Sequence, residues 1–408
     1  MTEHSVPVKR PMDGQSGLPY SALTTRIAGR GATAWAVHGR AMRLAEQGRD
    51  VIFLSVGDPD FETPSPVVEA AVDAMRGGRT HYVGMSGIPE LRAAIAQRHK
   101  AMTGQHVESE NVVVMAGAQA SLYSTLMCLA GPGDEVIAPE PRYATYEAVV
   151  GACGATMVDV PLRGERGFHI DPDDVAAAIT PRSRVLLINF PHNPTGATIT
   201  ADELAGLAEL CLKHDLWLVS DEVYATLVYE GAHISPCTLP GMADRTVVIS
   251  SLSKSHAMPG WRLGWAVAPG DLPAHLGNLA QCMLFGTPPF IQDAAVVALS
   301  REFHEIDTMH EEFRHRRDMV AQRINAMPLV SCRPPEGSMF AMIDVRGTGL
   351  SSIEFATRLV DAEALSILPG DGFGPSAEGY LRMSLTAPRD RLKEACDRIE
   401  RFVTGLNR

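Results

Sequence analysis

The stretch SLSKSHAMPGWR, from Ser251 to Arg262, decides the fold because of the residues that come before it. It directly follows Val247 to Ser250, and such a short β-branched run predicts a strand that is buried on both faces. Lys254 therefore stands at the end of a buried strand, with serines around it and Arg262 after it. An amine and phosphate-binding groups can meet there in one concave site. Taken alone, a solvated loop lysine is the commoner arrangement.

Two further loops follow buried strands in the same way. The loop FPHNPTG, Phe190 to Gly196, ends one apolar run, and SDEVY, Ser220 to Tyr224, ends another. Each has an ordinary explanation by itself, as a turn or as a helix cap. The carboxyl ends of parallel strands meet in the crevice where open α/β sheets bind ligands. The three loops together therefore predict one shared site.

The order of apolar runs predicts an α/β protein with a mostly parallel, doubly wound sheet. After about residue 300 a charged helical stretch, three short strand-like runs and a last helix predict an α+β segment, with which the helical stretch 33–47 should pack. We expect residues 1–20 to form a flexible tail, residues 64–300 a large domain, and residues 21–63 with 301–408 a small discontinuous domain. The strands expected in the large domain are Val112 to Met115, Glu135 to Ala138, Met157 to Val160, Val185 to Phe190, Leu216 to Ser220, Val247 to Ser250 and Gly264 to Ala268.

Composition disfavours several classes of function. The chain has 408 residues and a formal net charge of -12, which argues against nucleic acid or an anionic membrane as a partner. Seven scattered cysteines without a Cys-x-x-Cys spacing suit a reducing, cytoplasmic setting. His304, Glu305 and His310 do not have the spacing of a zinc motif, so no metal is expected.

The three loops resemble those of the fold-type I enzymes that use pyridoxal 5′-phosphate, and specifically the class I aminotransferases. The resemblance rests on Ser-x-Ser-Lys with an arginine eight residues later, and on Asn-Pro-Thr-Gly and Asp-Glu-x-Tyr upstream. It runs from about residue 23 to the end of the chain. Gly57 to Phe61, Thr80 to Tyr82, Gly117 to Ala120 and Leu381 to Ser384 support it. It implies a pyridoxal-phosphate-binding large domain, and transfer of an amino group from an amino acid to a 2-keto acid.

The resemblance also implies the catalytic residues. Lys254 would hold the cofactor as a Schiff base and, once substrate has displaced it, would carry a proton between the substrate Cα and the cofactor C4′. Asp221 would keep the pyridine nitrogen protonated. Tyr224 and Asn193 would hydrogen-bond the phenolic oxygen, and Tyr143 would stack on the ring.

Phosphate binding is implied for a second set of residues. The phosphate would be held by the Arg262 guanidinium, the hydroxyls of Ser251 and Ser253, and the backbone N–H groups of Ala118 and Gln119 at a helix start. These groups combine positive charge with fixed donors.

The remaining roles concern the substrate and the neighbouring subunit. Arg382 would clamp the substrate α-carboxylate with two parallel hydrogen bonds, with Asn193 and the backbone of Gly57 beside it. Tyr82 would reach the phosphate of the other subunit. A homodimer with shared active sites is therefore expected.

The substrate is less explicit in the sequence. Aspartate-preferring members of the family carry a lysine in the segment matching Gly117 to Gln119, whereas this chain has the neutral Gln119, which disfavours aspartate. Ala28 to Trp35, Leu239 to Thr246 and Cys282 to Gly286 resemble bacterial arginine–pyruvate transaminases. We therefore expect arginine or another basic amino acid as donor and a keto acid such as pyruvate as acceptor. A guanidinium needs an acidic partner, which the sequence does not locate.

Other functions stay open at this point. An aspartate-, aromatic- or alanine-type aminotransferase fits the same cofactor residues, and so does a pyridoxal-phosphate-dependent lyase or oxidase on this fold. Ser251-x-x-Lys254 also matches the Ser-Lys pair of penicillin-binding proteins, but the chain lacks their Lys-Thr-Gly.

Overall fold

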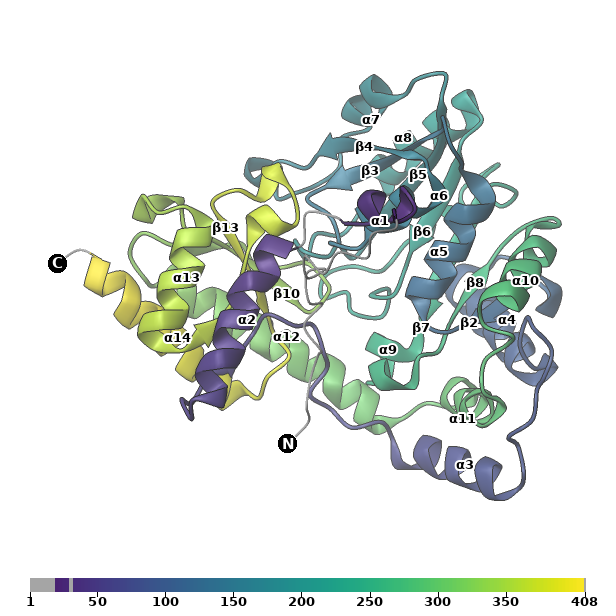
Figure 1. Ribbon diagram of the computed structural model, residues 1–408, viewed down its shortest axis with the longest axis horizontal. Helices are drawn as coiled ribbons and strands as arrows, with labels where there is room; N and C mark the ends of the chain where they lie inside the picture. Colours follow the sequence, from purple (N-terminus) through teal and green to yellow (C-terminus); the bar gives the residue numbers. More distant parts are fainter. Residues whose placement is uncertain (1–18, 29–31, 407–408) are drawn as a thin grey trace.

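The computed structural model describes residues 19–28 and 32–406 (Figure 1). Its centre is a seven-stranded sheet in the order β2-β8-β7-β6-β5-β3-β4. Strand β8 runs antiparallel to both of its neighbours, and the other pairs are parallel. All seven expected strands are present, with ends within two residues of the prediction. They are β2 (Val112–Met115), β3 (Glu135–Glu140), β4 (Thr156–Pro161), β5 (Ser183–Asn189), β6 (Trp217–Asp221), β7 (Thr246–Ser251) and β8 (Gly264–Val267).

Helices cover both faces of this sheet. Alternate side chains of a strand point to opposite faces, and the apolar side chains on each face pack against their own set of helices. Val185 and Leu187 of β5 pack in one cluster, with α5 (Ala118–Leu129), α6 (Tyr146–Cys153) and α10 (Leu272–Met283). Leu186 and Ile188 pack on the other face. That face is covered by α3 (Ser65–Arg76), α4 (Pro89–Thr103), α7 (Pro172–Ala178), α8 (Ala201–His214) and α11 (Pro289–Ser300). The doubly wound arrangement is thus confirmed.

A second, smaller layer lies beside the large sheet (Figure 1). One apolar cluster joins Val37 and Ala41 of α2 to residues between 309 and 403. This layer holds two small sheets, in the orders β12-β13-β10-β9 and β1-β11. Its elements are α2 (Ala32–Glu46), β1 (Ile52–Phe53), α12 (His304–Asn325), β9 (Ser331–Cys332), β10 (Phe340–Asp344), α13 (Ser352–Glu363), β11 (Leu365–Ser366), β12 (Leu368–Pro369), β13 (Tyr380–Ser384) and α14 (Arg389–Leu406).

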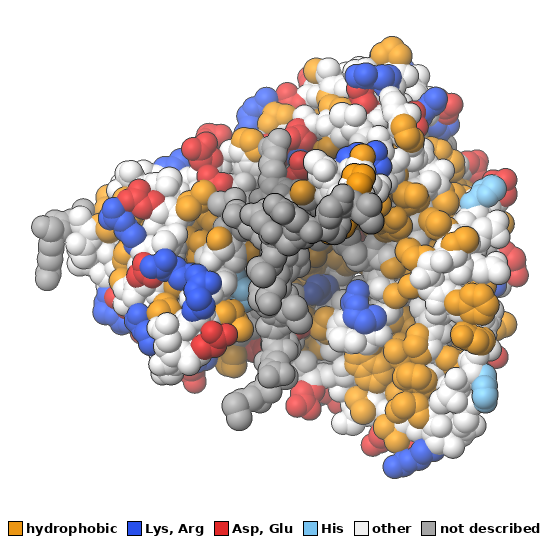
Figure 2. All heavy atoms as spheres, viewed as in Figure 1, with side chains coloured by type: hydrophobic (Ala, Val, Ile, Leu, Met, Phe, Trp, Pro, Cys, Tyr) orange, Lys and Arg blue, Asp and Glu red, His pale blue; other side chains and the backbone are white. Residues whose placement is uncertain are grey.

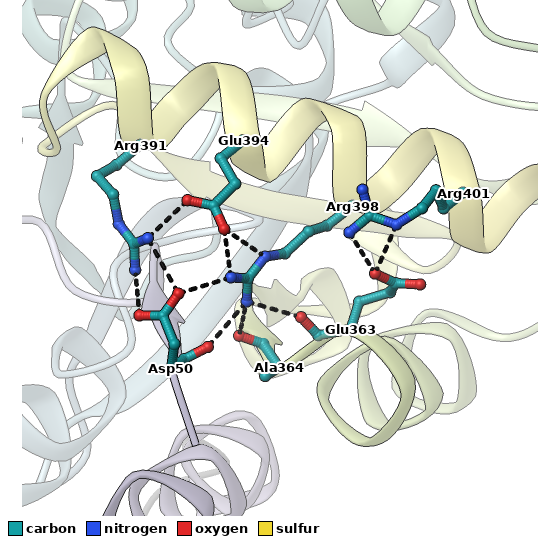
Figure 3. A network of polar contacts seen from close by, with 7 residues as sticks. All are labelled: Asp50, Glu363, Ala364, Arg391, Glu394, Arg398 and Arg401. Atoms are coloured by element: carbon teal, nitrogen blue, oxygen red, sulfur yellow. Dashed lines mark hydrogen bonds and ion pairs between the residues drawn. The ribbon is translucent and has the colours of Figure 1, made fainter. Parts of the chain in front are cut away.

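A polar network ties the beginning of this layer to its end (Figure 3). The Asp50 carboxylate accepts hydrogen bonds from Arg391 and Arg398 of α14, each at 2.8 Å. Arg398 is 8% exposed, and it also donates to the backbone oxygens of Asp50, Glu363 and Ala364. A buried arginine with this many acceptors fixes the relative position of three separate segments.

The short helix α1 (Leu23–Arg26) was not expected where it lies. It packs on α6 of the large sheet, and Arg26 Nε donates to Gly151 O at 3.0 Å. A Cβ atom at Gly151 would lie 2.5 Å from Arg26 O, so only glycine permits this approach. Residues 1–18 of the expected tail lie outside the described residues.

Membrane-spanning and metal-binding features were also sought in the described residues. No helix in residues 19–28 and 32–406 has the length and apolar character needed to cross a bilayer. In the same ranges, no three His, Cys, Asp or Glu residues gather as a possible metal site. All seven cysteines are free, and five of them are buried.

Candidate active site

The predicted site residues come together at the carboxyl ends of the parallel strands. Of the thirteen, twelve line a single cavity between the large sheet and the smaller layer: Gly57, Ala118, Gln119, Tyr143, Asn193, Asp221, Tyr224, Ser251, Ser253, Lys254, Arg262 and Arg382. Tyr82 does not line it. The Tyr82 side chain is 82% exposed, and its ring packs edge-on against Phe285 with the ring centroids 5.0 Å apart.

Lys254 lies on a single helical turn, α9 (Leu252–Ser255), and not on the irregular loop that we expected. The turn starts directly after β7. Ser251, the last residue of β7, caps the turn, because its hydroxyl accepts a hydrogen bond from Ser253 N at 3.3 Å. Lys254 Nζ donates to Gly57 O at 2.5 Å. Burial lowers the pKa of Lys254 to about 8, against the opposing charge of Asp58. An amine with this pKa can gain or lose a proton near neutral pH.

Asp221 is the last residue of β6 and is 7% exposed. Tyr146 Oη donates to its Oδ2 at 2.6 Å, and Val223 N donates to its Oδ1 at 3.3 Å. Burial raises the pKa of Asp221 to about 6, while these hydrogen bonds lower it. A buried carboxylate is stabilised in its charged form by a cation. The protonated pyridine nitrogen of the cofactor implied by the sequence would supply that cation.

The start of helix α5 and Arg262 give one end of the cavity a positive charge. Gly117 caps the helix with φ 87°, and a Cβ atom there would lie 2.4 Å from Arg262 Nη2. Glycine therefore allows the guanidinium to approach the helix start, where backbone N–H groups point outward. Arg262 is itself held by Pro259 O at 2.8 Å and Ala116 O at 3.3 Å. With Ser251 and Ser253 beside them, these groups suit a phosphate.

Arg382, on β13, is a buried cation with an open donor. Its guanidinium lies between the rings of Phe340 and Phe373, 4.3 and 4.6 Å from their centroids. Nη1 donates to Asn193 Oδ1 at 3.1 Å and Nη2 to Ser55 O at 2.6 Å. No described residue accepts a hydrogen bond from the buried Nε. Burial lowers the pKa of Arg382 to about 10, so it stays charged at neutral pH, and an arriving carboxylate would satisfy it.

Two tyrosines complete the cavity wall. Tyr224 is 5% exposed and shares a side-chain hydrogen bond with Asn193. Burial raises the pKa of Tyr224 and of Tyr143, so both phenols remain protonated and can donate. The ring of Tyr143 stands edge-on to Tyr146, at 5.7 Å between centroids.

Several residues around these groups were missed by sequence reasoning. Tyr146 binds Asp221, Asn189 Nδ2 donates to Asp221 O at 2.8 Å, and Phe340 and Phe373 enclose Arg382. Tyr146 had only a weak signal, because it is the first residue of α6 and lies three positions after Tyr143, whose ring it meets edge-on. The two phenylalanines had none, because they come from separate segments of the small layer.

This set of groups fits pyridoxal 5′-phosphate. Lys254 offers an amine to the aldehyde, and Asp221 a carboxylate to the ring nitrogen. Arg262 and the start of α5 offer positive charge to the phosphate. A separate cation, Arg382, is left for a carboxylate of the substrate. Among the described residues, this one cavity contains both the groups suited to the cofactor and the cation suited to the substrate.

Comparisons with known proteins agree with this chemistry. A family model described as aminotransferase class I and II matches residues 49–399. Arginine–pyruvate transaminase AruH of Pseudomonas aeruginosa is 53% identical over 380 residues, covering 93% of this chain and 97% of that protein. The structure of a Thermus thermophilus aspartate aminotransferase single mutant has a TM-score of 0.90 at 32% identity, covering 94% of this chain and 99% of that chain. Alanine aminotransferase from Pyrococcus furiosus has a TM-score of 0.90 at 29% identity, covering 95% and 100%.

These findings confirm the resemblance seen in the sequence. The family match spans most of the chain, and the solved structures share its whole architecture, which is that of fold-type I. The amine, acid and phosphate-binding groups lie in one cavity of that fold. The chain therefore belongs to the class I and II aminotransferases and is a transaminase that depends on pyridoxal 5′-phosphate.

Proposed function

We propose that this enzyme transfers the α-amino group of arginine, or of another basic amino acid, to a 2-keto acid such as pyruvate. The observation that carries the proposal is the 53% identity to arginine–pyruvate transaminase AruH, which extends over nearly all of both chains. The neutral Gln119 adds support, because its amide offers no charge to a second substrate carboxylate. Its Oε1 instead accepts a hydrogen bond from Thr145 at 3.0 Å.

The chemistry of the proposal divides between the cofactor and the chain. Bound pyridoxal 5′-phosphate supplies an electron sink for the bonding electrons of the substrate Cα–H bond. Lys254 would bind the cofactor aldehyde; once the amino group of the donor has displaced it, its free Nζ would carry the proton from the substrate Cα to the cofactor C4′. The pKa of about 8 suits this exchange near neutral pH.

The other residues bind and orient. Asp221, positioned by Tyr146, would hold a proton on the ring nitrogen of the cofactor, and Tyr224 with Asn193 would bind its phenolic oxygen. The Tyr143 ring would stack on the cofactor ring. Arg382 orients the α-carboxylate, with Asn193 and the Gly57 backbone beside it. Arg262, Ser251, Ser253 and the N–H groups of Ala118 and Gln119 would hold the phosphate.

The donor is tested by single half-reactions. The pyridoxal form is mixed with one amino acid at a time, and conversion to the pyridoxamine spectrum is followed. Arginine should convert the enzyme fastest, whereas aspartate is disfavoured by roughly 2 kcal/mol, the scale of one charged hydrogen bond. Fast conversion by aspartate, alanine or aromatic amino acids, with none by arginine, would refute the proposed donor and leave the transaminase assignment intact.

We also propose that the active unit is a homodimer with shared sites. Tyr82, Phe285 and Met283 are large apolar side chains with 82%, 49% and 38% of their surface exposed, and Met127 of α5 is 38% exposed. Hydrophobic side chains gather on the side of the molecule where α5, α10 and α11 lie (Figure 2). A second copy would cover such a surface, and would bring its Tyr82 to the phosphate of this chain.

Hybrid dimers test the shared site. The Lys254→Ala and Tyr82→Phe proteins are mixed, dissociated in a low concentration of denaturant and then refolded together. One site of each hybrid then combines an intact Lys254 with an intact Tyr82, so activity should rise above the sum of the two parents. An active monomer in sedimentation, or no gain on mixing, would overturn the proposal.

We further propose a cytoplasmic location, which the seven free cysteines support because free thiols suit a reducing compartment. The net charge of -12 makes nucleic acid and anionic membranes unfavourable partners. The partners are then the small amino-acid and keto-acid substrates.

A further inference from the structure

Among the aromatic and charged side chains of the cavity wall, Trp35 and Asp58 have no part in binding the cofactor or the substrate α-carboxylate as proposed above. The lining contains two carboxylates, Asp58 and Asp221. Asp221 is buried at the end of β6 and bound by Tyr146, on the side suited to the cofactor ring. Asp58 is therefore the lining carboxylate that a substrate side chain can meet.

Asp58 belongs to a segment that passes both groups expected to hold the substrate backbone. Ser55 O accepts a hydrogen bond from Arg382 Nη2 at 2.6 Å, and Gly57 O accepts one from Lys254 Nζ at 2.5 Å. The carboxylate clamp and the amine thus both lie against residues 55–57. The charge of Asp58, the next residue, raises the pKa of Lys254, so the Asp58 carboxylate lies within electrostatic range of the amine.

Trp35 is anchored to the same segment. Its ring stands edge-on to the ring of His38, with the centroids 5.5 Å apart, and His38 Nδ1 lies 2.7 Å from Ser55 Oγ. The indole still has 44% of its surface exposed while it lines the cavity. Trp35 therefore presents a large aromatic surface to the cavity without being buried in the core.

An aromatic surface and a carboxylate in one cavity wall suit a planar cation. A guanidinium stacks on indole and accepts a carboxylate partner along its edge. A substrate with a second carboxylate would instead meet the like charge of Asp58. We infer that Trp35 and Asp58 form the subsite for the cationic side chain of the amino donor, an inference that rests on the proposed function.

A competing role for Asp58 is to act on Lys254 alone. In that case its loss would slow every donor alike. The two roles are separated by comparing arginine with citrulline, which has the same length and shape but carries a neutral urea in place of the guanidinium.

The experiment measures half-reaction kcat/KM for both donors on the holoenzyme. Asp58→Asn should lower the arginine-to-citrulline ratio by about tenfold to a hundredfold, the value of one charged hydrogen bond. Asp58→Glu keeps the charge and should retain most of the ratio. Glu62→Gln removes one charge from an exposed residue outside the cavity lining, and should leave the ratio at the wild-type value.

Trp35 is tested in the same way. Trp35→Leu should lower the ratio by roughly threefold to thirtyfold, the range of a cation stacked on an aromatic ring, while Trp35→Phe should retain most of it. Absorbance of the bound cofactor and thermal melting check that each variant is folded and loaded.

The outcomes are distinguishable. If the wild type does not convert with arginine, the proposed function fails and the subsite fails with it. If the wild type prefers arginine but Asp58→Asn and Trp35→Leu keep the wild-type ratio, the subsite alone is overturned. An equal loss for arginine and citrulline in Asp58→Asn also overturns it, and assigns Asp58 to the amine.

Discussion

Lys254→Ala is expected to abolish turnover, because it removes the one lysine amine that lines the cavity among the described residues. The chain has five lysines. Those at 100, 213 and 393 are exposed on helices and do not line the cavity. The loss should be complete within detection in a steady-state assay with any donor. Melting should show a folded protein, because the Lys254 side chain makes one described hydrogen bond, to Gly57 O.

Borohydride reduction of the wild type, followed by peptide mapping, supplies the direct measurement. The pyridoxyl label should lie on the peptide that contains Lys254. Lys213→Ala is the matched control, since it removes an exposed lysine of α8, and it should keep both label and turnover. A label on any other lysine would show that the amine is misassigned.

Asp221→Asn is expected to keep cofactor binding and to lower turnover by several powers of ten. Asparagine can still accept the hydrogen bond from Tyr146, so the local structure should persist. It has no charge with which to hold a proton on the ring nitrogen, however, and each pKa unit lost from that nitrogen is worth about 1.4 kcal/mol.

Single-turnover kinetics with a saturating donor measure the effect. Asp215→Asn makes the same change at the exposed end of α8 and should retain wild-type rates. Near wild-type turnover in Asp221→Asn would mean that the carboxylate serves only the structure. A smaller loss in Tyr146→Phe would separate the hydrogen bond from the charge.

The sequence was sufficient for the large sheet because strands buried on both faces carry a local signal. Runs such as Val112 to Met115 are apolar throughout, so their positions follow from composition alone. It was also sufficient for side chains placed at strand ends, such as Asn193 and Asp221. It missed the helical turn that carries Lys254, because four residues are too few to show helical periodicity.

The rest depended on contacts between distant segments. Phe340 lies at the start of β10 and Phe373 directly after the turn 370–372, and the rings of both contact the Arg382 guanidinium. Asp58 is brought towards Lys254 across almost 200 positions of the chain, as the Gly57 contact shows. No local pattern contains such pairings, because they are set by the packing of the layers.

The network around Asp50 has a consequence for how the chain is synthesised. Asp50 pairs with Arg391 and Arg398 of α14, which follow it by 341 and 348 positions and are translated after every other described helix. Every strand of the large sheet lies between residues 112 and 267 and is translated earlier. The large sheet can thus assemble on the nascent chain, while Val37 and Ala41 of α2 wait with part of their apolar surface uncovered until the C-terminal residues arrive. Translation of the eighteen residues of α14 therefore supplies the partners that complete the small layer.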